Sequence, residues 1–141
     1  MNADSYGLKL NEQSSEQTVY DYNMLMSAMN VSVSKHLMDK NFTVVWANDY
    51  FYSQTLYTKQ EYEAIYHNSC RKYFEQYPEE YEKLAMAIEQ ALLKRKSGYE
   101  CICRMPRKDG SCSWIKVSGM FSDQKINDIP VIYSTFIDVT E

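Results

Sequence analysis

The sequence predicts an α+β domain with an antiparallel five-stranded sheet and helices gathered on one face. Three observations lead to this fold class. Residues 99–121 hold two runs rich in β-formers on either side of Asp109-Gly110, which is typical of a hairpin. Residues 31–47 hold a second pair of such runs around a turn at Asp39. Between the two hairpins, apolar residues recur at helical spacing.

The amino-acid composition limits the kinds of protein to which this chain can belong. The chain has 141 residues, 45% hydrophobic and 24% charged, which fits one globular domain. It has no apolar run of about 18 residues and no secretory signal, so we expect a cytoplasmic protein without membrane contact. The net charge is −4 and the basic residues are dispersed, which argues against nucleic-acid binding. The four cysteines are expected to be reduced thiols, because their spacing suits neither a disulfide nor a zinc site.

The N-terminal 30 residues are expected to form a polar tail followed by an amphipathic helix. The tail covers residues 1–14 and the helix residues 15–29, with Ser15 as a possible cap. Apolar residues recur at steps of three and four along the helix, at Val19, Tyr22, Met26 and Met29. The main domain is then residues 31–141.

The main domain divides into strands and helices in a clear order. Residues 31–38 and 42–47 are predicted strands. Asn48 is a natural N-cap for a short helix to Thr55, and Thr58 with Glu61 forms a capping box for another. A longer helix is expected from Pro78 until residues 94–98 end it. After the hairpin, residues 123–130 read as a polar loop and residues 131–139 as the last strand.

The register of the hairpin around Asp109-Gly110 follows from the length of its turn. A turn of two or four residues pairs Arg107 with Cys112 and Ile102 with Val117. One face of this hairpin then carries Ile102, Arg104, Ile115 and Val117. The other face carries Cys101, Cys103, Met105, Cys112, Trp114 and Lys116. Because both faces of the hairpin carry apolar residues, we expect a sheet that is covered on both sides.

From residue 31 to residue 141 the sequence resembles a PAS domain, the sensory module of bacterial signalling proteins. The residues that carry the resemblance are Asp39, Trp46-Ala-Asn48, Tyr57-Thr-Lys-Gln-Glu61, Arg104, Lys108-Asp-Gly110, Trp114 and Asp138-Val-Thr-Glu141. The resemblance implies strand order 2-1-5-4-3, with helices and a ligand cavity on the inner face. It departs at Leu56, where the family usually places Gly after the first short helix.

The resemblance also implies candidate site residues. The ligand-pocket candidates are His36, Met38, Val44, Trp46, Ile102, Arg104, Ile115 and Val117. Glu61 and Arg104 occupy positions that form a structural ion pair in many family members, although an inward Arg104 would also suit a carboxylate ligand. His36 is interpreted first as a satisfied core or rim histidine and second as a ligand contact.

No cofactor is expected. Asn68-Ser-Cys70-Arg71 resembles the Asn-Cys-Arg of flavin-binding light sensors, but residues 72–76 differ and Ile115 replaces their flavin-binding Asn. The predicted long helix, where haem-binding relatives carry their ligand, contains no His. The sequence also lacks a nucleophile-base set, a phosphate loop and a metal cluster.

These observations predict a non-catalytic sensor or dimerisation module of a cytoplasmic bacterial signalling protein. Its C-terminal effector is expected to be a diguanylate cyclase, or next a histidine kinase, and an unknown small-molecule ligand or partner supplies the signal. The alternative is a purely structural dimerisation module with a filled core, and a third option is a flavin or haem sensor. We expect a homodimer whose seam is Val19, Tyr22, Met26 and Met29, although the same helix is also suited to cover its own sheet.

Overall fold

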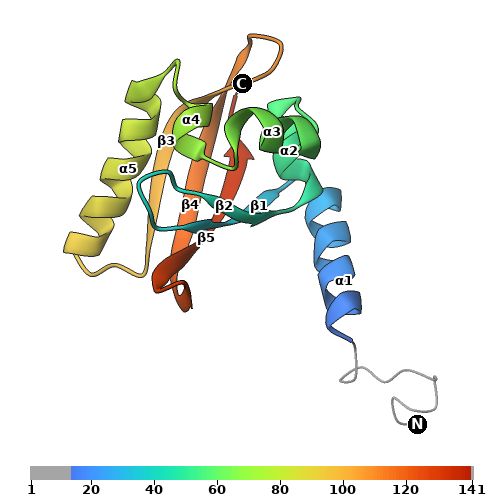
Figure 1. Ribbon diagram of the computed structural model, residues 1–141, viewed down its shortest axis with the longest axis horizontal. Coiled ribbons are helices and arrows are strands. Elements are labelled where there is room, and N and C mark those ends of the chain that lie inside the picture. The colour runs from blue at the N-terminus through green and yellow to red at the C-terminus, as the bar shows by residue number, and fades with distance from the viewer. Residues whose placement is uncertain (1–13, 141) are drawn as a thin grey trace.

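The computed structural model describes residues 14–140 and contains one antiparallel five-stranded sheet (Figure 1). The strands are β1 (Ser32–Leu37), β2 (Val44–Ala47), β3 (Gly98–Pro106), β4 (Cys112–Ile126) and β5 (Ile129–Asp138). Their order across the sheet is β2-β1-β5-β4-β3, as the resemblance to PAS domains implies. Among the described residues no helix is both long enough and apolar enough to cross a membrane.

Five helices accompany the sheet. They are α1 (Ser15–Ala28), α2 (Asp49–Thr55), α3 (Lys59–Tyr66), α4 (Cys70–Tyr73) and α5 (Pro78–Leu93). Helices α2 to α5 supply buried side chains to a single core with the inner face of the sheet. Helix α1 instead extends away from the domain, and none of its residues is buried (Figure 1). The predicted tail lies outside the described residues, apart from Ser14.

The predicted caps position the helices. Asn48 accepts a hydrogen bond from the backbone N–H of Phe51, and Thr58 and Glu61 form the complete capping box. The N-cap of α1 is Ser14 rather than Ser15, and its hydroxyl accepts from the N–H of Gln17. Helix α2 ends at Leu56 in the left-handed conformation, with φ of 65°, so the chain keeps the geometry that a glycine would adopt more easily.

The predicted register of the β3–β4 hairpin is wrong by one residue. Pro106 pairs with Cys112, so the loop has five residues (107–111) rather than an even number. Side chains alternate between the two faces of a strand. A loop with an odd number of residues therefore reverses which residues of one strand share a face with a given set on the other strand. Strand β4 keeps its predicted orientation, with Ile115 and Val117 buried. The inward residues of β3 are therefore Cys101, Cys103 and Met105, while Ile102 and Arg104 lie on the outer face.

The β1–β2 hairpin contains a second irregularity. His36 pairs with Val44, but Lys35 pairs with Trp46, so Val45 is an extra residue in a β-bulge. The bulge shifts the phase of β2, which buries Val44 and leaves Trp46 36% exposed. The predicted inward placement of Trp46 is therefore wrong.

The expected polar loop at residues 123–130 is mostly strand. Strand β4 extends to Ile126, strand β5 begins at Ile129, and Asn127-Asp128 joins them. Both turn residues have positive φ, 50° and 64°, which suits a tight two-residue hairpin turn. Polarity alone does not distinguish such an exposed ribbon from a loop.

Candidate functional site

The inner face of the sheet, where the sequence predicts a ligand cavity, is partly polar. Strand β1 contributes Ser32, Ser34 and His36, all fully buried. Strand β5 adds Ser134, whose hydroxyl lies 2.8 Å from the Tyr99 hydroxyl. The wall is completed by apolar side chains that are at most 4% exposed, namely Cys103, Met105, Ile115, Val117, Ile132 and Phe136.

His36 is a satisfied core histidine. Its Nδ1 lies 3.0 Å from the carbonyl oxygen of Phe42, which only accepts, so Nδ1 carries the proton. Its Nε2 then accepts from the Ser34 hydroxyl at 2.7 Å. The ring stacks on Phe42 with centroids 4.0 Å apart. Burial lowers the pKa of His36 to about 4, although the Phe42 carbonyl and the charge of Asp39 oppose that shift.

Cys70 is a buried thiol rather than an exposed nucleophile. Its Sγ lies 3.6 Å from Nδ1 of His36. Burial raises the pKa of Cys70 to about 12, and the nearby charge of Asp39 acts in the same direction, against a hydrogen bond from Tyr62. The thiol therefore stays protonated at neutral pH and packs as a small apolar group.

The predicted pocket residues that face inward pack against other core side chains. Four pockets stand out in the described part of the chain, and one of these, with a volume of about 120 Å³, is lined by a predicted pocket residue, Met38. It lies between the end of β1 and α5, beside Leu84 and Ile88. His36, Val44, Ile115 and Val117 face inward as predicted, but they pack within the core cluster or on its rings.

Three predicted pocket residues lie elsewhere. Ile102 is 55% exposed on the outer face of the sheet, and Trp46 is on the outer side of its bulge. Arg104 is directly opposite Trp114 on the outer face, with its guanidinium carbon 5.7 Å from the centre of the indole ring. The loop length and the bulge together account for all three corrections.

The predicted ion pair between Glu61 and Arg104 does not form. Glu61 instead accepts from Lys108 at 2.6 Å, which joins the first turn of α3 to the β3–β4 loop. The hydrogen bond from Lys108 and that from the backbone of Thr58 hold the pKa of Glu61 below its ordinary value.

Arg104 pairs with a buried carboxylate that sequence reasoning missed, Glu80. Only 1% of Glu80 is exposed, and it accepts from the backbone N–H of Arg104 at 2.8 Å, from its Nε at 3.3 Å and from Lys83 at 3.1 Å. Burial alone would raise the pKa of Glu80, but these donors outweigh burial and lower it. The signal in the sequence was its position, because Glu80 occupies the apolar stripe that continues with Leu84 and Ile88.

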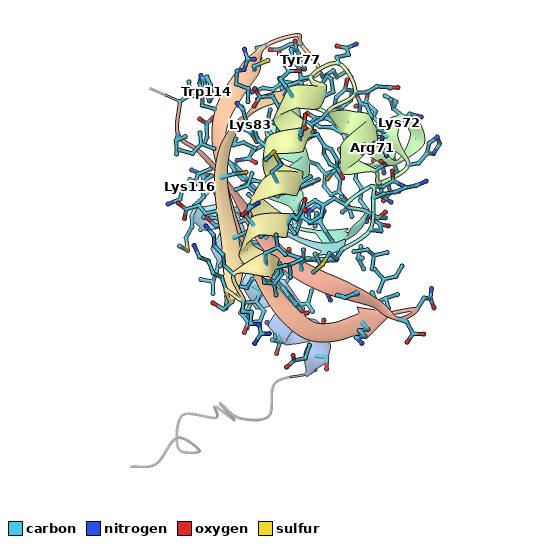
Figure 2. The ribbon with its side chains drawn as sticks, turned by 90° about the vertical axis from the view of Figure 1, so that its left-hand side faces the viewer. Arg71, Lys72, Tyr77, Lys83, Trp114 and Lys116 are labelled. Carbon is cyan, nitrogen blue, oxygen red and sulfur yellow. The ribbon has the colours of Figure 1, made fainter. Side chains whose placement is uncertain are left out.

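The outer face of the sheet carries exposed apolar and aromatic side chains. Its exposed apolar members are Trp46, Ile102, Trp114, Met120 and Ile137. Of the outer residues predicted from the hairpin, Cys112, Trp114 and Lys116 keep that position, whereas Cys101, Cys103 and Met105 face inward. Lys83 of α5 reaches to 5.8 Å from the Trp114 ring, and Figure 2 shows both with Lys116 on the β3 side of α5.

The C-terminal residues pack on the backbone of Trp114. The N–H of Val139 donates to the Trp114 carbonyl at 2.8 Å, and the Trp114 N–H donates to the Thr140 hydroxyl at 2.8 Å. Asp138 accepts from the N–H of Thr140 and lies 3.5 Å from Nη2 of Arg107. We call residues 138–140 the exit segment.

The described residues contain no group of three His, Cys, Asp or Glu side chains placed to hold a metal ion. All four cysteines are free, with Cys112 exposed and Cys70 and Cys103 buried. At the level of sequence, no family model matches the chain. No curated protein matches it either.

Solved structures do resemble it. The PAS domain of a protein from Colwellia psychrerythraea is 12% identical, with a TM-score of 0.63 over 87% of this chain and 98% of that one. The PAS domain of the fruit-fly ELK potassium channel is 15% identical, with a TM-score of 0.60 over 92% and 100%. A sensory box histidine kinase/response regulator from Burkholderia thailandensis is 16% identical, with a TM-score of 0.58 over 84% of each chain. The strand order, the inner helices and these likenesses together establish that this chain has the PAS fold.

Proposed function

We propose that this chain is a non-catalytic signalling module that works by dimerisation and by contact with an effector, rather than by holding a ligand inside its core. The proposal is supported by the inner face, whose apolar side chains belong to one core cluster and where both ring nitrogens of His36 have partners within the protein. A PAS fold in a sensory histidine kinase supports a role in signal transduction. The effector we propose is a diguanylate cyclase, with a histidine kinase as the second choice.

Two apolar surfaces support a homodimer. The predicted seam exposes Val19 by 50%, Tyr22 by 60% and Met29, the C-cap of α1, by 64%. Met26 is half-buried and lies four residues after Tyr22 on the same side of the helix. The outer face of the sheet adds a second apolar area around Trp114. Exposed apolar surfaces of this kind mark contacts between proteins. Two copies of α1 packed along the stripe would form a closed two-fold contact.

Light scattering tests the dimer. We expect a dimer at 200 µM, a monomer for Met26→Glu and a dimer for Met24→Glu, which places the same charge on the opposite side of α1. A monomeric wild-type protein, or a Met26→Glu variant that stays dimeric, would refute this seam. Circular dichroism confirms that both variants keep their helices.

Absorbance tests the absence of an interior chromophore. Purified protein is expected to show no band between about 350 and 500 nm, because the side chains of the inner face pack in one core cluster and Cys70 is buried beside His36. A flavin or haem spectrum that survives gel filtration would overturn the filled-core proposal.

A further inference from the structure

A polar pocket of about 270 Å³ lies outside the core, between α3, α4 and the β3–β4 loop. Tyr57, Tyr66 and Tyr73 line one side of it. The Tyr66 hydroxyl donates to the Tyr57 hydroxyl at 2.8 Å, and the Tyr73 hydroxyl donates to the Pro106 carbonyl. The Tyr57 hydroxyl accepts from Tyr66, and its own proton has no acceptor among the described residues. One hydrogen-bond donor is therefore left for a ligand.

Three cations converge on the same pocket, from two segments far apart in the sequence. Lys72 comes from α4, and Arg107 and Lys108 come from the β3–β4 loop. Against them, the pocket lining holds one carboxylate, Glu75. Cations therefore outnumber carboxylates in the lining itself, and Glu61 and Asp138 contact Lys108 and Arg107 from outside it.

Each cation has capacity left for a ligand. Lys72 makes no ion pair with another described residue. Arg107 uses Nε on Ser113 and Nη2 on Asp138, while Nη1 has no hydrogen-bond acceptor in the described chain. Lys108 holds Glu61 through one of its three N–H donors and lies 5.8 Å from the centre of the Tyr57 ring.

We propose that this pocket binds a small molecule carrying an oxyanion, a carboxylate or a phosphate, with Lys72, Arg107 and Lys108 as its cations and the Tyr57 hydroxyl as a further donor. Charged donors that surround an oxyanion give the stronger class of hydrogen bonds. The volume is below the range of about 300–1,000 Å³ that drug-sized ligands occupy, so the ligand has few heavy atoms.

Arg107 connects this pocket to the exit segment. Its Nη2 lies 3.5 Å from Asp138, which also accepts from the N–H of Thr140. An anion that binds the free Nη1 shares the guanidinium charge with Asp138, which weakens the 3.5 Å contact to the carboxylate at the end of β5. This coupling rests on the proposed signalling function, whereas binding itself does not.

The test is an amide NMR titration of the 141-residue chain with sodium phosphate, and separately with sodium succinate, each against sodium chloride at equal ionic strength. We expect saturable shifts at residues of the pocket and at Val139 and Thr140 with at least one of the two anions. The anion that saturates identifies the ligand class. Lys72→Gln is expected to weaken binding by about tenfold, since it removes a charged hydrogen bond.

Two variants sharpen the assignment. Arg71→Gln is the matched control, because Arg71 is adjacent in sequence but lines the neighbouring groove, and Figure 2 shows both residues on the side of α5 away from Trp114. Its affinity should equal that of the wild type. Asp138→Asn removes the competitor for Arg107 and is expected to bind the anion more tightly, the opposite of what general damage would do.

Several results would overturn the inference. Shifts that do not saturate, that chloride reproduces, or that Lys72→Gln leaves unchanged would mean that the pocket is not a site. Saturable binding without any shift at Val139 or Thr140 would retain the site and refute the coupling. Because light scattering tests the dimer separately, failure here is distinguishable from failure of the proposed function.

Discussion

The buried His36 makes the stability of the domain depend on pH. An unfolded histidine has a pKa near 6.5, whereas burial lowers the pKa of His36 in the folded protein to about 4. Since the folded pKa lies below the unfolded one, the unfolded chain binds the proton more readily over this range. Stability therefore falls as the pH drops from about 6.5 towards 4.

The magnitude follows from the two pKa values. Each tenfold difference in proton affinity corresponds to about 1.36 kcal/mol, so the full effect is about 3 kcal/mol. Between pH 7 and pH 5 the loss is about 2 kcal/mol, and most carboxylates remain ionised over that interval. Urea unfolding monitored at several pH values measures the loss as a shift of the midpoint.

A second histidine provides the control. His67 is exposed at the end of α3, so His67→Gln should show the same loss as the wild type. His36→Gln removes the titrating group and should show no such dependence. The ring resonances of His36 give an independent readout in the wild-type protein. A His36 ring that titrates near pH 6.5, or a free energy of unfolding that is flat from pH 7 to pH 5, would refute the reasoning.

Three further substitutions test the packing, and thermal or urea unfolding measures each. Glu80→Ala is expected to cost about 3 kcal/mol, because it removes the buried acceptor of the Arg104 N–H, of Arg104 Nε and of Lys83. Since the pKa of Glu80 is lowered in the folded protein, its ionic contribution is present at neutral pH and is lost as the pH falls through that lowered pKa, so the difference between variant and wild type should shrink in acid. Gly119→Ala is expected to cost about 2 kcal/mol, because a Cβ there would overlap the Tyr99 ring, and Tyr99→Ala should relieve that added cost in the double variant. Leu56→Gly is expected to stabilise the domain by about 1 kcal/mol, since it removes a leucine that is held in the left-handed conformation and is 45% exposed. A loss of stability instead would mean that the Leu56 side chain contributes packing.

Local signals in the sequence were sufficient to place the starts of the helices. Asn48 and the Thr58 capping box start their helices where predicted, and Pro78 lies in the first turn of α5. These features are determined by residues within a few positions of one another. The strand order came from the resemblance to PAS domains and is confirmed by the sheet.

The site was harder to predict because it depends on whether two connections, one in each hairpin, contain an odd or an even number of residues. In β3, apolar side chains occupy both alternating sets, with Ile102 in one and Cys103 in the other, so the pattern does not reveal which set is buried. The loop at 107–111 and the bulge at Val45 decide that question, and neither leaves a clear composition signal. Glu80 was missed for a different reason, since its burial requires Arg104 from a distant strand.

Helix α1 has a mechanical consequence for any attached segment. Its 14 residues form a rod of about 21 Å, joined to β1 through three residues that include the left-handed Asn30. A rotation of about 10° at this joint would displace the far end of the rod by about 4 Å, roughly the width of one side chain. A turn at this joint, which the Val31 N–H spans by donating to the Met26 carbonyl, would therefore convert a small angular change beside β1 into a displacement of several ångströms at the start of α1.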